Sequence, residues 1–116
     1  MNISYNGNSL RVNNKSVSFP FDIDKVLVED EFIFVLLDIP TRKEYRNYAE
    51  NIYGLRQGEI IWQVENPRIV YPENNFTPFV GISLSDGRLT GTDFYGLTCI
   101  INKKTGKLEG QLSPVR

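Results

Sequence analysis

The stretch from Asn51 to Val64 constrains the fold most, because two apolar-rich runs flank a pair of residues that suits a tight turn. The pair is Gln57-Gly58, and a glycine accepts the positive φ angle that such turns require. The Ile, Tyr, Leu and Trp residues on either side favour a pleated, half-buried strand. The stretch therefore predicts a β-hairpin.

A weaker copy of this segment occurs nearer the C-terminus. The Tyr-Gly-Leu triplet at 53–55 recurs at 95–97, and the run that begins at Gly58 is echoed by the run that begins at Gly106. The two pairs are offset by different numbers of residues. The chain thus repeats a building unit with an insertion instead of following a strict period.

Turn signals divide the rest of the chain into short strands. The pairs Asn6-Gly7 and Asn13-Asn14 predict that residues 1–19 form a flap of two or three strands. Further hairpins are expected over 24–37, 79–93 and 96–112, with 32–37 buried on both faces, and the proline-rich segment 65–78 is expected to be loop. We therefore predict a single all-β domain, residues 1–116, with an antiparallel meander of about eight strands plus the N-terminal flap.

The connections of an antiparallel meander alternate between two rims, because successive strands reverse direction. The tight turns share one rim, named here the tight-turn rim. The other, the long-loop rim, collects the long connections 39–50 and 65–78, the Phe94-Tyr95 connection and the segment 22–24 before the first core strand. By this assignment acidic side chains outnumber basic ones on the long-loop rim, and long loops with aromatic residues on a rigid sheet are a common binding surface. The predicted partner-binding residues are Asp22, Asp24, Glu44, Tyr45, Tyr48, Tyr71, Glu73 and Phe76.

The composition removes most catalytic chemistry, because the chain contains no histidine. Histidine-based triads, zinc sites and general bases are thereby excluded. The glycines form no phosphate-binding loop, and Asp22 with Asp24 matches a solvated strand start better than a carboxylate pair or a calcium site. We expect a protein that is not an enzyme and that has no cofactor, no metal and no direct nucleic-acid ligand, since phosphates avoid an acidic rim.

Single residues and the overall charge add further expectations. Trp62 is expected in the core, and Cys99, the single cysteine, is expected to be a buried apolar residue. Tyr45 and Tyr48 either pack on the sheet or contact a partner. The net charge is −1, and neither a membrane-spanning apolar run nor a signal peptide is visible, so a cytoplasmic location without membrane contact is expected.

Two segments, 58–63 and 102–108, resemble the strand–turn–strand signatures of quinoprotein-like β-propeller blades. The similarity covers residues 51–112, and blades of about 40 to 48 residues leave room for only two, which implies a half-propeller-like sheet. A quinone cofactor is not implied.

A small, open, half-propeller-like β protein resembles immunity proteins of bacterial contact-dependent growth-inhibition systems, which bind and neutralise a cognate toxin domain. This resemblance implies an immunity protein, monomeric when free or 1:1 with its toxin. The resemblance also implies that the toxin is a nuclease, and the acidic rim adds the expectation that this nuclease is cationic. Two alternatives stay open: a structural or adaptor β-domain that self-associates through a sheet edge, and a small-molecule-binding or enzymatic domain.

Overall fold

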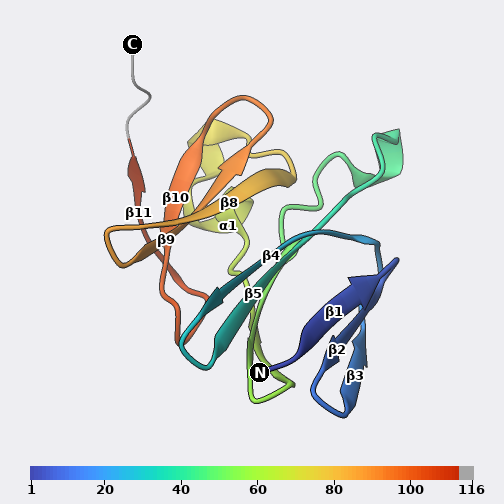
Figure 1. Cartoon of the computed structure of the whole chain (residues 1–116). Helices are drawn as coiled ribbons and strands as arrows, with labels where there is room; N and C mark the ends of the chain where they lie inside the picture. The colour runs from blue at the N-terminus through green and yellow to red at the C-terminus, as the bar shows by residue number, and fades with distance from the viewer. Residues whose placement is uncertain (113–116) are drawn as a thin grey trace.

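A computed structural model describes residues 1–112, and its strands form three antiparallel sheets (Figure 1). The N-terminal flap consists of β1 (Ile3–Asn6), β2 (Ser9–Val12) and β3 (Lys15–Ser18). The first large sheet consists of β4 (Ile23–Glu29), β5 (Phe32–Leu37), β6 (Ile52–Arg56) and β7 (Glu59–Gln63). The second large sheet consists of β8 (Phe79–Ser85), β9 (Arg88–Asp93), β10 (Thr98–Ile101) and β11 (Leu108–Leu112).

The predicted all-β architecture is confirmed. In both large sheets each strand pairs with its neighbour in sequence, so β4 to β11 form the expected meander and β1 to β3 the expected flap. The repeat prediction is half right. Gly58 and Gly106 both precede the fourth strand of a sheet, but the triplet 53–55 lies inside β6 whereas 95–97 lies in the turn after β9.

The two long connections contain short helical turns. The first holds η1 (Lys43–Tyr45), and the second holds α1 (Pro67–Val70) and η2 (Pro72–Asn74). The expectation that 65–78 is entirely loop is therefore wrong. Proline at the first helical position suits a helix start, and the Asn66 side chain accepts a hydrogen bond from the Arg68 amide, which caps α1.

Strand β5 is the shared wall of two hydrophobic cores. Its side chains alternate: Phe34 and Leu36 pack with the second large sheet, whereas Ile33, Val35 and Leu37 pack with the flap. Residues 33–37 are all buried, which confirms that this strand is covered on both faces. The molecule thus has three layers, with the first large sheet between the flap and the second large sheet.

Trp62 on β7 joins the two large sheets. Its indole lies against two glycines, since a Cβ atom built on Gly54 of β6 would lie 2.2 Å from the ring and one built on Gly106 would lie 2.6 Å from it. The indole Nε1 donates a hydrogen bond of 2.8 Å to the Lys103 carbonyl in the β10–β11 turn. Trp62 is 6% exposed, so its predicted place in the core is confirmed.

Polar groups fix the same sheet-to-sheet arrangement. The buried Asn51 side chain donates to the carbonyls of Leu37 and Phe79 and accepts from the Phe79 amide, which ties the start of β8 to the first large sheet. The Glu65 carboxylate accepts a hydrogen bond from the Leu108 amide at the start of β11. Every polar group in these contacts has a partner, as burial requires.

The contact between Trp62 and Gly106 can be tested with a matched pair of glycine variants. Gly106 and Gly87 share a φ of 75°, but nothing lies within 4 Å of a Cβ at Gly87. Gly87→Ala should cost roughly 1 to 2 kcal/mol from backbone strain alone. Gly106→Ala should cost about 1 to 3 kcal/mol more, because the ring must move.

Removing the indole provides the complementary measurement. Trp62→Ala should lower the free energy of unfolding by about 3 to 5 kcal/mol, mainly through the cavity left between the sheets. Urea denaturation of the three variants measures these differences. Equal stabilities for Gly106→Ala and Gly87→Ala would show that the indole contact does not constrain the sheets.

Candidate functional site: a groove on the long-loop rim

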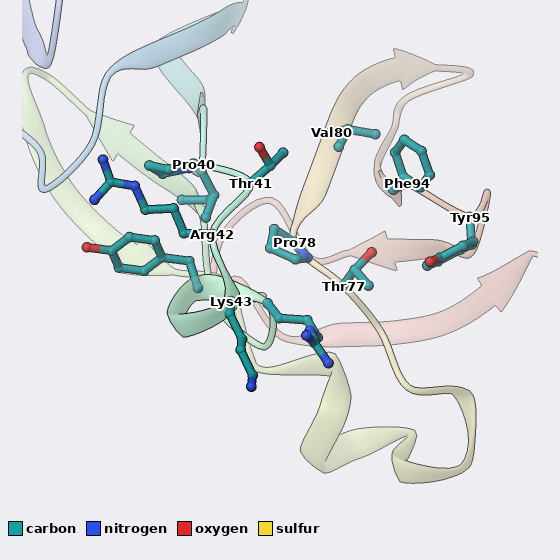
Figure 2. A pocket seen from close by; sticks show the side chains of 12 residues that line it. Pro40, Thr41, Arg42, Lys43, Thr77, Pro78, Val80, Phe94 and Tyr95 are labelled. Carbon is teal, nitrogen blue, oxygen red and sulfur yellow. The ribbon is translucent and has the colours of Figure 1, made fainter.

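Three connections that are far apart in sequence meet on the long-loop rim and enclose a groove of about 410 Å³ (Figure 2). Its lining residues come from 39–46, 77–80 and 94–95. These are the two long loops and the β9–β10 connection. The prediction from alternating strand direction, that these three connections share one rim, is therefore confirmed. In Figure 2 Phe94 and Tyr95 lie on one side, Pro40 to Lys43 on the other, and Pro78 between them.

Phe94 and Tyr95 are the most exposed aromatic residues of the groove, at 71% and 74%. Their rings contact each other edge to face, with centroids 5.3 Å apart and planes at 89°. Water contact with two large rings is costly unless a partner covers them, and aromatic residues are enriched at the centres of protein interfaces. The β9–β10 connection therefore presents an apolar contact surface at the edge of the groove.

The buried carboxylate of Asp93 holds this connection in place. Its Oδ1 accepts hydrogen bonds from the amides of Tyr95 at 3.0 Å and Leu97 at 2.9 Å. Its Oδ2 accepts from the Thr77 amide at 3.1 Å and lies 3.3 Å from the Thr77 hydroxyl. One carboxylate thus connects the turn carrying the aromatic pair to the loop that forms the groove floor.

A β-bulge directs Val80 into the same groove. The pairing of β8 with β9 shifts between Phe79 and Gly81, which leaves Val80 as the extra residue. A bulge redirects one side chain out of the regular alternation. Phe79 is buried in the core, whereas Val80 is 53% exposed and lines the groove.

The charged residues that line the groove are all cationic: Arg42, Lys43 and Arg46. All three are exposed. Arg42 lies 4.0 Å from the Glu44 carboxylate, in a solvent-exposed pair that contributes little to stability. Within residues 1–112, Lys43 and Arg46 form no ion pair, so their charges are available to a partner.

The structure corrects the assignment of Phe76, and it places a second predicted residue, Tyr71, half-buried against the core between the large sheets. Phe76 is completely buried in the core between the large sheets, so its assignment to a partner surface is wrong. Its ring packs with Phe79 at 6.2 Å and with Tyr71 at 6.4 Å between centroids. Its position in a long loop predicts a surface residue, but the loop folds back and the Phe76 ring covers the core.

The other predicted residues are accessible but do not form one site. Tyr45 and Tyr48 are half-buried and pack edge to face on Phe21, and of the eight predicted residues Tyr45 alone lines the groove. Asp22, Asp24, Glu44 and Glu73 are exposed. Glu73 lies on η2, and Asp24 lies within β4. Tyr45 and Tyr48 thus have a packing role, because both rings contact Phe21.

On the long-loop rim, exposed acidic residues outnumber basic ones by less than the sequence predicts. Asp93 is buried and internally hydrogen-bonded, and Glu65 faces the β10–β11 turn through its bond to the Leu108 amide. The missed residues are Phe94, Tyr95 and Val80. The first two were visible as an aromatic pair in a turn placed on this rim, whereas a bulge at Val80 leaves no clear signal in sequence.

The tight-turn rim has a hollow of its own, of about 420 Å³, where the β4–β5, β8–β9 and β10–β11 turns meet. Opposite charges pair there, since Lys103 binds the Glu29 carboxylate.

In the described part of the chain no three His, Cys, Asp or Glu side chains are grouped so that they could bind a metal ion. None of the helices in residues 1–112 has the length and apolar character needed to cross a membrane.

A family match covers residues 1–112. The chain belongs to the family described as Domain of unknown function (DUF7957). No curated protein and no solved structure matches the chain. Family membership thus extends over the flap and both large sheets.

Asp93 should be essential for the shape of the groove. Asp93→Asn should cost about 1 to 3 kcal/mol of stability, because the amide NH₂ would face an N–H donor where a carboxylate oxygen now accepts. Hydrogen exchange at the Tyr95 and Leu97 amides should become faster than exchange at the central amides of β5. If both amides kept their protection in a folded variant, Asp93 would not be what holds the turn.

Cys99 should be unreactive in the folded protein. It is fully buried, and burial, together with the Asp93 charge, raises the pKa of its thiol from 9.0 to about 12. Because the thiolate is the nucleophile, iodoacetamide at pH 8 should modify Cys99 only after denaturation, as mass spectrometry would show. Since the folded pKa is the higher one, the thiol favours unfolding as pH rises from about 9 towards 12. Rapid labelling without denaturant would contradict the buried position.

Proposed function

We propose that this protein is an immunity protein, which binds a cognate bacterial toxin domain through the long-loop rim and covers that domain's active site. The observation that carries the proposal is the exposed pair of Phe94 and Tyr95 beside the groove, held by a buried carboxylate on a rigid two-sheet body. A preorganised aromatic pair loses little conformational entropy on binding. Such a surface is what tight inhibition by simple occlusion requires.

The fold supports a binding role for this rim. Trp62, Asn51 and Glu65 fix one large sheet against the other, so the loops that line the groove are attached to a common framework. Interfaces that form without large rearrangement are typical of preorganised complexes. The proposed toxin contacts are made by groove residues and by the exposed carboxylates Asp22, Asp24, Glu44 and Glu73 around them.

The structure does not support the expected positive charge of the partner. The expectation of a cationic nuclease rests on an excess of acidic over basic residues on the rim. That excess is small in the structure, because Asp93 is buried and Glu65 is bonded to the Leu108 amide. The groove itself is lined by cations. The proposal therefore keeps a toxin domain as the partner and does not depend on that domain being basic.

The interface can be tested by truncating the aromatic pair. Phe94→Ala with Tyr95→Ala should change the free energy of unfolding by no more than about 0.5 kcal/mol, because both rings are exposed. The double variant should weaken binding to the toxin domain encoded beside this gene at least about tenfold. Calorimetry gives the affinity, and growth during toxin expression gives the protection.

Tyr5→Ala is the matched control, because Tyr5 is an exposed tyrosine of the flap, 47% accessible. It should leave affinity and protection unchanged. If the aromatic double variant bound like the wild type and Tyr5→Ala did not, the flap would be the interface. If co-expression of this protein protected cells from no toxin encoded beside its gene, the immunity function would be refuted.

Self-association through a sheet edge is the second candidate, and one observation favours it. β7 is the last strand of the first large sheet, and it exposes Ile60 and Ile61 at 44% and 43%. Unpaired edges with apolar residues can pair with a second copy. Sedimentation at increasing concentration would show a dimer that Ile61→Lys abolishes if this candidate were correct.

A further inference from the structure

We infer that the groove on the long-loop rim recognises an acidic segment of the partner protein, one in which an apolar side chain is flanked by carboxylates. The inference rests on the proposed function, because it takes the groove to be part of the toxin interface. It concerns the chemistry of the contact, which runs opposite in sign to the cationic partner expected from the sequence.

The floor and one side of the groove are apolar. Val80, Phe94 and Tyr95 are exposed there, and Pro40 and Pro78 contribute rings without a backbone N–H (Figure 2). Two prolines reduce the backbone donors that could bind a partner's main chain. Affinity must then come from burying an apolar side chain and from charged side chains at the margin.

The charged margin is basic on the side opposite the aromatic pair. Lys43 and Arg46 are exposed and form no ion pair within residues 1–112, and Arg42 shares its charge with one exposed carboxylate. Arginine binds carboxylates with two parallel hydrogen bonds, which adds geometric selectivity. A basic partner segment would meet three like charges and is selected against.

Carboxylates are a better match for these cations than nucleic-acid phosphates. A phosphate backbone needs a continuous basic track, and binding strengthens with each cation along it. Here the three cations all come from one short stretch, 42–46, and Asp38 and Glu44 are exposed in the same connection between β5 and β6. A chain of net charge −1 also lacks the general attraction that nucleic acids require.

The inference is tested with a short synthetic peptide that has a central leucine flanked by aspartates, titrated into isotope-labelled protein and followed by NMR. Amide signals of 41–46, 77, 79, 80 and 94–95 should shift, and signals of the tight-turn rim should not. A matched peptide with lysines in place of the aspartates should bind at least about tenfold more weakly. Equal binding of the two peptides, or tighter binding of a short oligothymidylate to the same residues, would overturn the inference.

Two charge variants of equal net charge complete the test. Lys43→Glu with Arg46→Glu should weaken binding of the acidic peptide and of the toxin at least about fivefold. Lys104→Glu with Lys107→Glu, both exposed and close to the β10–β11 turn, should leave both unchanged. An effect of the same size from the second pair would reduce the result to overall charge and contradict a groove-specific contact.

The outcomes separate this inference from the proposed function. If the first charge variant neutralised the toxin like the wild type while the Phe94/Tyr95 variant did not, the acidic-segment inference would fail and the immunity function would stand. If the acidic peptide bound in the groove but no toxin was neutralised, the immunity function alone would fail.

Discussion

The packing of Trp62 between Gly54 and Gly106 is the contact on which the arrangement of the two large sheets depends. Both glycines leave room that any side chain would fill, and the indole N–H is satisfied by the Lys103 carbonyl. A large apolar ring is thereby buried without an unpaired polar group. Because Gly106 precedes β11, this contact also sets where the fourth strand of the second sheet begins.

The groove exists because the two sheets are held in one orientation. Its lining comes from connections attached to the first sheet on one side and to the second sheet on the other, so a change in sheet orientation would separate them. Asn51 fixes the start of β8, and Asp93 fixes the turn after β9 to Thr77. Exposed aromatic residues on such a supported turn can bind a partner without first being ordered.

In this DUF7957 domain a flap covers one face of the first sheet, and the second sheet supplies the turn that carries Phe94 and Tyr95. The flap protects Ile33, Val35 and Leu37 from water and takes no part in lining the groove. The proposed binding surface is thus separate from the surfaces that stabilise the fold, so groove residues can change at little cost to folding.

Local pattern in the sequence determined the all-β class, the hairpins, the burial of 33–37 on both faces and the core positions of Trp62 and Cys99. It did so because alternation and turn chemistry depend on neighbouring residues. Strand parity also placed the groove's three connections on one rim. Only the tertiary structure decided that Phe76 covers the core, that Asp93 is internal, and that Val80 and three cations line the same groove as the aromatic pair. Those outcomes depend on contacts between residues from different sheets and loops, for which periodicity along the chain carries no information.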